Sequence, residues 1–431
     1  MLSKTALGTA TPQHRRIVLI GGGYASIDAY KALARRLGPR LGKDVQVTVI
    51  NPDAYHTFHG WTGEVLAGLL PLDVTLTPLE PLFRRARVLL GRASGVDLAA
   101  RTVSVETPDG GQETLPYDEL MIGTGSSDPF ERVPGLREYG WRLKDTRDMQ
   151  RFQKHLLALV TDRAAPGSVV PARVLVIGGG FAGVEMAGAI RELAGAHGAK
   201  VDITLMTSSD QLLDVLRPKH ASLADHAAGE LEKLGVQVRY AARVRCLTPQ
   251  GIELESGEAL PFELVLYTAG VAFTVLPGTE GLARTAGGQL LVDRELRVPG
   301  QPHVWAAGDA ARVALPRGEG YCPVNALWAM KQGMCVGNNM AAVLSGQPSK
   351  AFAYGGLGQS ASLRVGGGVT ELLGVPLTGW IGWIARLAFF IWFMPSKVGG
   401  WRVLRAWMQL GQRRTLGKGK PSGLAAEAIG G

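Results

Sequence analysis

Two glycine-rich segments, each placed directly after a short apolar run, constrain the fold of this chain most. Residues 16–20 read Arg-Ile-Val-Leu-Ile and lead into a loop at 21–26, and residues 173–177 read Arg-Val-Leu-Val-Ile and lead into a loop at 178–183. A continuous apolar run of this kind is typical of a buried parallel strand. Glycines after such a strand let the chain turn tightly and let backbone N–H groups approach a pyrophosphate at the start of a helix. Two such units in one chain predict two bound dinucleotides.

The remaining landmarks repeat in the same order after each loop. A second strand is expected at 45–50 and again at 201–206, and a strand ending in a Gly-containing turn at 117–125 and again at 264–270. A strand pair is expected near 87–107, a bridging helix at 146–160, and a strand at 303–306 that leads into Gly308 and Asp309. The repeat predicts an α/β fold with two Rossmann-like domains, the second inserted into the first. We expect domain segments at 14–145, 146–290, 291–370 and 371–431, the last being C-terminal helices and tail.

Composition narrows the class of protein. A chain of 431 residues is long enough for two or three domains with full cores. Its 58 glycines are well above the usual share of roughly 7%. The three cysteines, Cys246, Cys322 and Cys335, form no CxxC motif. This spacing favours a reducing compartment and argues against a redox-active disulfide. No metal site is predicted.

The net charge of +9 is concentrated near the C-terminus. Between Leu372 and Ala426 the chain carries bases and no acid, whereas the rest of the chain is close to neutral. The same segment holds five of the nine tryptophans. Nucleic acid would attract the bases but rarely needs so much apolar surface, so we expect an anionic membrane surface and no nucleic acid as partner. The bases counted here are Arg386, Lys397, Arg402, Arg405, Arg413, Arg414, Lys418 and Lys420.

Two helices are expected within this basic segment. Residues 380–395 are mostly apolar, with Arg386 inside, but they fall short of the roughly 20 residues that span a bilayer. The next segment places its bases on one side and Trp401, Val403, Leu404 and Trp407 on the other, which is typical of an interfacial amphipathic helix. Packing of the helix pair on the protein core or on a dimer mate is the alternative, and both can hold together. We expect a loose leader up to about residue 14 and a disordered tail beyond about Arg414.

These landmarks together resemble the two-dinucleotide flavoprotein reductases, and in detail the type II NADH dehydrogenases, single-subunit NADH:quinone reductases. The resemblance covers roughly residues 15–415. Its more specific elements are Tyr55-His56, Pro134-Gly135-Leu136, Leu143-Lys144, Gly183-Val184-Glu185-Met186-Ala187-Gly188, Thr268-Ala269-Gly270-Val271, Gly308-Asp309, Phe352-Ala353-Tyr354, Gly358 and the Trp-rich basic C-terminus.

The resemblance implies FAD at the first loop and NADH at the second. Asp309 would bind the ribitol chain of FAD, and Asn51 would hold its adenosine ribose. Asn325 is expected to cap a helix that points its N-terminus at the flavin, where the helix dipole favours the anion of reduced flavin. The implied cofactor-binding residues are Gly21, Gly22, Gly23, Tyr24, Ala25, Ser26, Asn51, Gly123, Thr124, Gly125, Gly178, Gly179, Gly180, Phe181, Ala182, Gly183, Thr207, Gly270, Gly308, Asp309, Asn325 and Ala326.

Three residues are candidates for catalysis on the same resemblance. Glu185 stands in the family's Gly-Val-Glu position near flavin and nicotinamide. The family's Ala-Gln-x-x-x-Gln-Gln pattern near the quinone is Ala-Leu-Trp-Ala-Met-Lys-Gln here, so that Lys331 and Gln332 end it. Alignment of the two repeats puts Thr207 where an acid would reject a 2′-phosphate. The choice between NADH and NADPH is open from the residues, and the resemblance favours NADH.

The expected function is therefore a peripheral membrane enzyme at the cytoplasmic face. It would pass a hydride from NAD(P)H to FAD and two electrons on to a membrane quinone without pumping protons. One alternative is a sulfide:quinone reductase, in which Cys322 would lie near the flavin. Another is a redox sensor or scaffold without quinone turnover, suggested by Ser26, Asn51, Leu327 and Lys331. A homodimer is a further expectation.

Overall fold

The computed structural model describes residues 14–415, with side chains to 411. It divides into two compact units, each assembled from three stretches of the chain. Unit 1 contains residues up to 56 together with 78–126 and 273–355, and unit 2 contains 57–77, 127–272 and the residues from 356. The expected leader lies almost wholly outside the described residues, as does the part of the expected tail beyond 415. The proposed domain boundaries remain a prediction.

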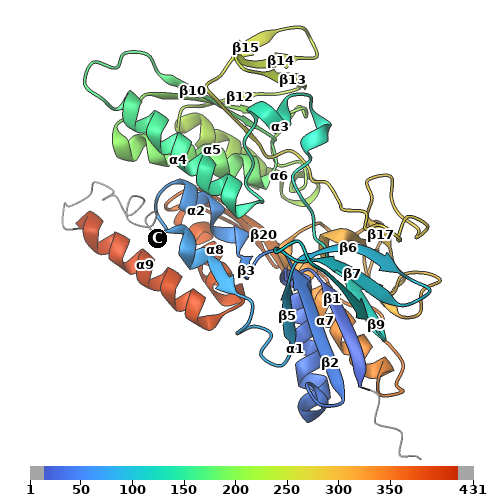
Figure 1. Ribbon diagram of the computed structural model, residues 1–431. Helices are drawn as coiled ribbons and strands as arrows, with labels where there is room; N and C mark the ends of the chain where they lie inside the picture. The colour runs from blue at the N-terminus through green and yellow to red at the C-terminus, as the bar shows by residue number, and fades with distance from the viewer. Residues whose placement is uncertain (1–13, 416–431) are drawn as a thin grey trace, which may run out of the picture. The chain divides into compact units, whose positions relative to one another are not determined.

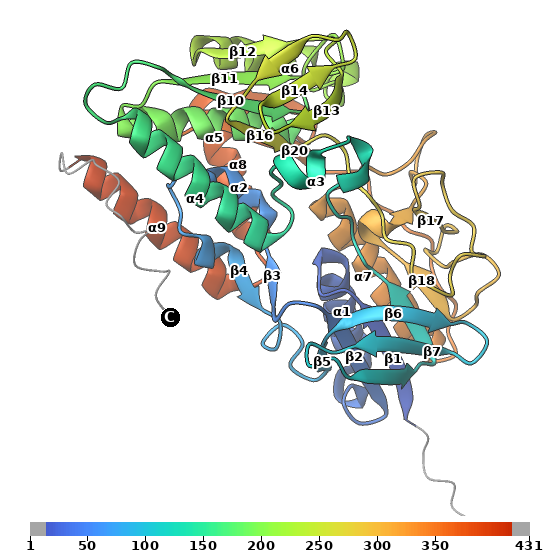
Figure 2. The same ribbon diagram turned by 45° about the horizontal axis from the view of Figure 1, so that its top comes forward.

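Unit 1 is built on a parallel sheet of order β18-β9-β1-β2-β5 (Figures 1 and 2). The strands are β1 (Arg15–Ile20), β2 (Val45–Asn51), β5 (Arg87–Leu90), β9 (Glu119–Ile122) and β18 (Val304–Ala306). Helices α1 (Tyr24–Leu37) and α7 (Ala326–Val343) lie side by side. The expected strand pair near 87–107 is more elaborate in the structure. β5 joins the parallel sheet, while β6 (Arg92–Asp97), β7 (Thr102–Glu106) and β8 (Gln112–Pro116) form a separate antiparallel sheet.

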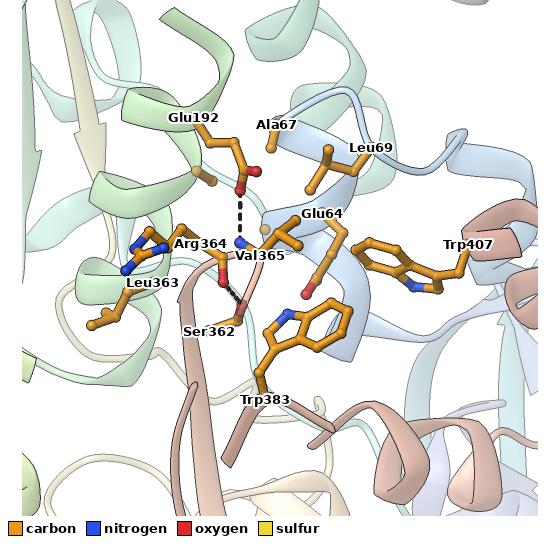
Figure 3. Close-up of a pocket in the computed structure, with 12 residues that line it drawn as sticks. Glu64, Ala67, Leu69, Glu192, Ser362, Leu363, Arg364, Val365, Trp383 and Trp407 are labelled. Carbon is orange, nitrogen blue, oxygen red and sulfur yellow. Dashed lines mark hydrogen bonds between the residues drawn. The ribbon is translucent and has the colours of Figure 1, made fainter. Parts of the chain in front are cut away.

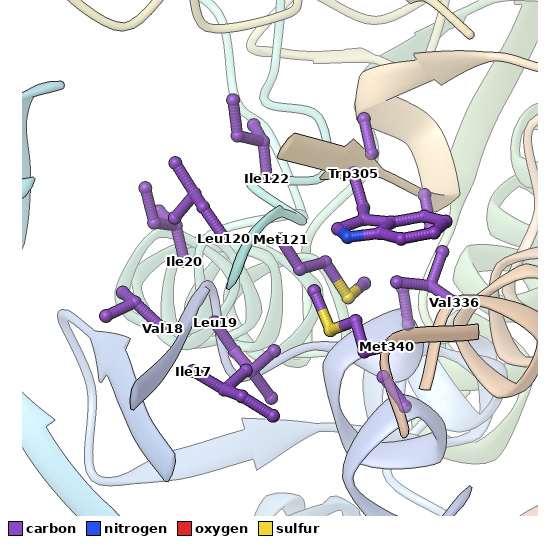
Figure 4. Close-up of a cluster of buried hydrophobic side chains, with 14 of the residues drawn as sticks. Ile17, Val18, Leu19, Ile20, Leu120, Met121, Ile122, Trp305, Val336 and Met340 are labelled. Atoms are coloured by element: carbon purple, nitrogen blue, oxygen red, sulfur yellow. The ribbon is translucent and has the colours of Figure 1, made fainter. Parts of the chain in front are cut away.

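The core of unit 1 contains the apolar runs that the sequence places in buried strands. All four residues of β9 and the last four of β1 are buried. Figure 4 shows their side chains with Trp305 from β18 and two residues of α7, namely Ile17, Val18, Leu19, Ile20, Leu120, Met121, Ile122, Val336 and Met340. This core fixes the carboxyl ends of β1, β2 and β9, where the first glycine loop begins.

Two glycines on α7 allow it to approach α1 very closely. A Cβ built on Gly333 would lie 1.9 Å from the Ala25 carbonyl oxygen, and one built on Gly337 would lie 2.1 Å from that of Ala29. No side chain fits at these distances, so this pair of glycines sets the spacing of the two helices. The contact also fixes the residues at the start of α1 and α7, which belong to the first predicted dinucleotide site.

Unit 2 is built on a parallel sheet of order β12-β11-β10-β16. Its strands are β10 (Ala172–Ile177), β11 (Val201–Met206), β12 (Val236–Arg239) and β16 (Leu264–Tyr267). Helix α5 (Phe181–His197) follows the second glycine loop, and α4 (Thr146–Arg163) is capped by the Asp145 side chain. The other elements are α2 (Thr62–Leu66), α3 (Leu136–Tyr139), α6 (Arg217–Lys233), β13 (Val244–Thr248), β14 (Gly251–Leu254) and β15 (Ala259–Pro261).

The C-terminal segment belongs to unit 2. It begins with an antiparallel sheet of β20 (Gly358–Arg364), β21 (Gly367–Leu372) and β22 (Val375–Thr378), followed by α8 (Gly379–Phe393) and α9 (Lys397–Thr415). A Cβ built on Gly188 of α5 would lie 2.0 Å from the Leu363 carbonyl oxygen, so α5 packs tightly on β20. Within residues 14–415 no helix combines the length and the apolarity needed to cross a bilayer. Four short strands complete the list: β3 (Tyr55–Thr57), β4 (Leu76–Pro78), β17 (Leu290–Leu291) and β19 (Ala311–Arg312).

We predict that Gly337→Ala destabilises the protein by about 1–3 kcal/mol, because the added methyl group forces α7 away from α1. Gly229→Ala on α6 is the matched control, since a Cβ there meets no atom within 4 Å. Alanine should raise helix stability at that position by up to about 1 kcal/mol. Thermal unfolding followed by circular dichroism checks both. Equal melting temperatures for the two variants would contradict the close helix contact.

Candidate functional site

The two glycine loops share one geometry. Gly21 and Gly178 both have a positive φ, of 100° and 126°. The N–H of Gly21 donates to the Ile50 carbonyl and that of Gly178 to the Met206 carbonyl, both at 2.8 Å. Each loop is therefore fixed to the end of the second strand of its sheet, which confirms the alignment of the two repeats. Helices α1 and α5 follow directly, so that their free N–H groups point toward the place a pyrophosphate would take.

Asn51 closes the first loop from the end of β2. Its Oδ1 accepts a hydrogen bond from the Gly22 N–H at 2.8 Å, and its amide nitrogen donates to the Asp53 carbonyl at 2.7 Å. A Cβ built on Gly23 meets no atom within 4 Å. The space beside Gly23 is thus open to a ligand. Thr124, in the turn after β9, has a buried hydroxyl without a hydrogen-bond partner among the described residues.

Asp309 lies in the short turn after β18, where hydrogen bonds hold both its side chain and its backbone neighbours. Its Oδ2 accepts a hydrogen bond from the Ser126 hydroxyl at 2.5 Å. The N–H of Gly308 donates to Gln332 Oε1 at 2.8 Å, and the Gln289 side chain donates to the Asp309 carbonyl at 2.9 Å. The structure therefore brings Gly308, Asp309 and Gln332 together. Gln332 is buried and braces the turn that carries Asp309.

The start of α7 also has the expected form. Asn325 caps it, because its Oδ1 accepts a hydrogen bond from the Trp328 N–H at 3.1 Å. Lys331 lies on the second turn of α7, with its ammonium 5.7 Å from the centre of the Tyr354 ring. The positive charge of Lys331 also acts on Asp28 of α1, where burial raises the pKa of the carboxyl against the lowering effects of Lys31, Lys331 and Arg35. The catalytic roles of Lys331 and Gln332 remain predictions.

The second loop has the same parts as the first. Thr207 follows β11 in the position of Asn51, and a Cβ built on Gly179 would lie 2.7 Å from its hydroxyl oxygen. A Cβ built on Gly183 would lie 1.7 Å from the Gly178 carbonyl oxygen, so only glycine fits there. The Thr268 hydroxyl donates to the Ile177 carbonyl at 2.9 Å. That contact places the turn ending at Gly270 beside the loop.

Glu185, on the second turn of α5, belongs to a buried group of charges in unit 2. Its Oε1 accepts hydrogen bonds from the Ser362 N–H at 2.8 Å and from Arg386 Nε at 3.1 Å. Arg386 also reaches Glu64 of α2, with 2.5 Å between Nη1 and Oε1, and donates to the Gly60 carbonyl at 2.8 Å. The Arg386 side chain is 1% exposed and that of Glu64 4%. One guanidinium therefore serves two carboxylates, and we call this group the Glu64–Arg386–Glu185 triad.

The triad leaves one negative charge unbalanced when both carboxylates are ionised. Burial raises the pKa of Glu185 to about 7, with Arg386 opposing the rise and Glu64 adding to it. The Glu185 carboxyl can therefore take up or release a proton near neutral pH. A group with such a pKa at a site of acid–base chemistry is a candidate for proton transfer.

A small cavity adjoins the triad, with a volume of about 10 Å³. Glu64, Glu192, Trp383 and Trp407 are among the residues that line it (Figure 3). The two indole rings meet edge to face at 5.1 Å, and the Val365 N–H donates to Glu192 at 3.1 Å. The space is that of roughly one water molecule. The cavity is too small for an organic substrate.

Sequence reasoning found Glu185 but missed its partners. Arg386 is the only charge within the otherwise apolar run at 380–395, and such a charge is commonly buried and paired. That signal could have been used. Glu64 gave no comparable signal, because a glutamate in a short helix is ordinarily solvated.

Three of the eight bases counted near the C-terminus are engaged within the protein. Arg386 is buried in the triad, and Arg402 of α9 forms an ion pair with Asp73. Lys397 lies over the Trp392 ring, 4.6 Å from its centre. Val403, expected on the membrane side of α9, is fully buried. Arg413, Arg414, Lys418 and Lys420 have side chains outside the described part of the chain.

The chain is similar to known proteins in both sequence and fold. The family model of the pyridine nucleotide-disulphide oxidoreductases matches residues 15–333. The demethylphylloquinone reductase NdbB of Synechocystis is 25% identical over 394 residues, which cover 90% of this chain and 94% of that protein. The type II NADH:quinone oxidoreductase of Staphylococcus aureus is 26% identical over 380 residues, covering 85% and 91%. In fold, NDH2 from Plasmodium falciparum, solved in complex with NADH, matches with a TM-score of 0.82 at 16% identity, covering 93% and 98%.

We predict that Arg386→Ala destabilises the protein by about 3–5 kcal/mol, because it leaves the buried Glu64 carboxylate and the partly buried Glu185 carboxylate without their cation. Arg405→Ala is the matched control: this exposed arginine on α9 forms no ion pair within residues 14–415. It should change the free energy of unfolding by less than about 0.5 kcal/mol. Thermal unfolding of the two variants decides this, and similar melting temperatures would exclude a structural triad.

We also predict a pH dependence that belongs to Glu185. Its ordinary pKa is 4.5 and its folded pKa is about 7, so the folded protein binds this proton more tightly than the unfolded chain does. The resulting stabilisation is present below pH 4.5 and is lost as the pH rises through about 7. Glu185→Gln mimics the protonated carboxyl and lacks this term. The melting temperature of the variant minus that of the parent should therefore rise from pH 5 to pH 8, and a constant difference would refute the raised pKa.

Proposed function

Because the chain belongs to the pyridine nucleotide-disulphide oxidoreductase family, we propose that it is a flavoprotein that transfers electrons from NAD(P)H to a quinone. The observation that carries the proposal is the presence of two dinucleotide loops of one geometry in a chain that matches curated quinone reductases over most of its length. FAD belongs at the first loop and NADH at the second. Neither the sulfide:quinone reductase nor the sensor alternative gains support.

The first site fits FAD in its donors and in its shape. A pyrophosphate and its ribose suit the open space at Gly23 and the N–H groups at the start of α1. They also suit the Thr124 hydroxyl, which has no partner within the described part of the chain. Asp309, oriented by Ser126, offers a charged acceptor to the hydroxylated chain. The capped N-terminus of α7 supplies a positive dipole end. When bound, the flavin supplies the chemistry that links a two-electron hydride donor to a quinone.

The cysteines favour an electron acceptor other than an internal disulfide. All three are free, and burial raises the pKa of Cys322 to about 11, so its thiol stays protonated at neutral pH. The Cys322 thiol donates to the Ala314 carbonyl at 3.5 Å. A dithiol relay is therefore missing from the described chain, and an external acceptor such as a quinone takes its place. Glu185, with a pKa of about 7, is the residue we assign to proton exchange.

The helices α8 and α9 carry the membrane part of the proposal. Gly382, Arg386 and Phe390 recur every four residues and pack inward, Phe390 against the Trp61 ring at 5.4 Å. The outward residues remain exposed, with Ile381 at 68%, Trp392 at 70% and Trp401 at 69%. Such an apolar face beside exposed bases is typical of an interfacial helix pair. The exposed large apolar residues of the two helices are Trp380, Ile381, Ile384, Trp392, Val398, Trp401 and Met408, and Leu373 and Val375 are exposed in the β21–β22 segment before them.

We infer peripheral binding of these residues to an anionic membrane surface, with the quinone taken from the membrane. The free bases of the segment add at most about 1 kcal/mol each near such a surface. A face of this kind also suits a homodimer, which is the competing occupant. We propose that the protein binds at the cytoplasmic face of the membrane.

Anaerobic titration of the purified protein tests the proposed reaction. NADH should bleach the flavin absorption. A soluble quinone should restore the absorption at least as fast as the enzyme turns over in the steady state. Asp309→Ala should purify with much less flavin, since it removes a charged hydrogen bond of about 1.5–3 kcal/mol. Asp210→Ala, an exposed acid in unit 2, should keep its flavin. A flavin that NADH reduces but no quinone reoxidises would contradict the quinone assignment.

Sedimentation with vesicles tests the membrane face. The double variant Ile381→Glu, Trp401→Glu should bind anionic vesicles at least about tenfold more weakly, because two carboxylates enter the apolar face. NADH oxidation with a soluble quinone should stay unchanged. Val169→Glu is the matched control, since Val169 is 76% exposed in the loop before β10. Equal vesicle binding by the double variant and the control would assign the face to protein–protein packing.

A further inference from the structure

In the second dinucleotide site, the residue that follows the second strand, β11, is not an acid. We call the turn that begins at this residue the nucleotide corner. The parallel register pairs Ile20 with Ile50 in unit 1 and Ile177 with Met206 in unit 2. Thr207 therefore occupies the position of Asn51, directly after the second strand. In Rossmann domains that select NAD, an acid near this strand end binds the ribose hydroxyls and repels a 2′-phosphate. A threonine is uncharged, so it does not repel a 2′-phosphate.

The Thr207 side chain is buried and directed at the glycine loop. It is 6% exposed, and its hydroxyl oxygen accepts a hydrogen bond from the Ser209 N–H at 3.2 Å. The hydroxyl proton therefore remains available for an acceptor on a ligand that lies against Gly179. Ser208 is exposed at the same turn. A phosphate oxygen accepts hydrogen bonds from hydroxyl groups, whereas a carboxylate in place of Thr207 would repel it.

Two arginines follow Thr207 across the sheet, Arg239 at the end of β12 and Arg243 in the segment before β13. The Thr207 N–H donates to the Arg239 carbonyl at 2.9 Å, and the Ala242 N–H donates to the Thr207 carbonyl at 2.9 Å. The Arg239 guanidinium is occupied by Glu258, at 2.7 Å. Arg243, one residue beyond Ala242, is exposed and makes no ion pair with any carboxylate in the described chain. The acid next to the turn, Asp210, is exposed and accepts from the Ser209 hydroxyl at 3.4 Å.

From this arrangement we propose that the second site accepts a 2′-phosphorylated adenosine, so that NADPH is a substrate in addition to NADH. Thr207 and Ser208 donate to the 2′-phosphate, and Arg243 balances its charge. The inference rests on the proposed function, because it names a further substrate for the same dinucleotide site. Thr207 is the residue that decides whether the site accepts NADPH as well as NADH.

Calorimetric titration of the purified protein with 5′-ADP and with 2′,5′-ADP tests the inference without redox turnover. We expect the two Kd values to agree within about tenfold. Thr207→Glu should weaken 2′,5′-ADP by at least about tenfold more than 5′-ADP, because like charges then meet. Arg243→Gln should weaken only 2′,5′-ADP, whereas Asp210→Asn should leave the ratio unchanged. Arg294→Gln, an exposed arginine of unit 1, is the matched control for charge.

The outcomes separate the two claims. Tight binding of 5′-ADP with 2′,5′-ADP more than about a hundredfold weaker would overturn the inference and leave the proposed function intact. Recovery of 2′,5′-ADP binding in Asp210→Asn would overturn it as well, and would identify Asp210 as the selecting acid. Binding of neither nucleotide would contradict the dinucleotide site itself and with it the proposed function.

Discussion

Unit 2 depends on one buried guanidinium. Arg386 joins α8 to the short helix α2 through Glu64 and to α5 through Glu185, so three segments far apart in the chain meet at a single side chain. Ions taken out of water cost several kcal/mol each, and only their mutual attraction and complete hydrogen bonding offset that cost. Arg386 meets the condition with two carboxylates and the Gly60 carbonyl. Removal of Arg386 leaves the two carboxylates without their cation.

This interaction explains how the C-terminal segment can pack on unit 2 with one side and offer the other side to a membrane. The inward side of α8 is fixed by Arg386 and by the aromatic contacts of Phe390. On the same side, Gly382 lies so close to β21 that the Thr370 hydroxyl donates to its carbonyl at 2.8 Å. With that side committed, the tryptophans and aliphatic residues of the opposite side stay exposed. The packing alternative and the membrane alternative are therefore compatible, because they concern different sides of the same helix.

The sequence predicted what depends on local pattern. Buried parallel strands appear as apolar runs, and glycine loops follow them, so the β-α-β units and the equivalence of Asn51 and Thr207 could be read directly. Asn325 as a helix cap follows from the same local chemistry. The triad could not be read in this way, because Glu64 and Arg386 are 322 residues apart and no period relates them. Gln332 shows the same limit, since its partner Gly308 is brought to it by tertiary packing. Charge counting likewise failed for Arg402, whose partner Asp73 lies in a distant segment.

A double-mutant comparison at the triad tests the central structural claim most directly. Arg386→Met removes the cation but keeps much of its volume, and Glu64→Gln removes the carboxylate that is the more deeply buried of the two. If one guanidinium neutralises this acid, the double variant should melt at a higher temperature than Arg386→Met alone, because fewer buried charges remain unpaired. Melting temperatures of the parent, both single variants and the double variant give the answer. Simple addition of the two single effects would contradict the account.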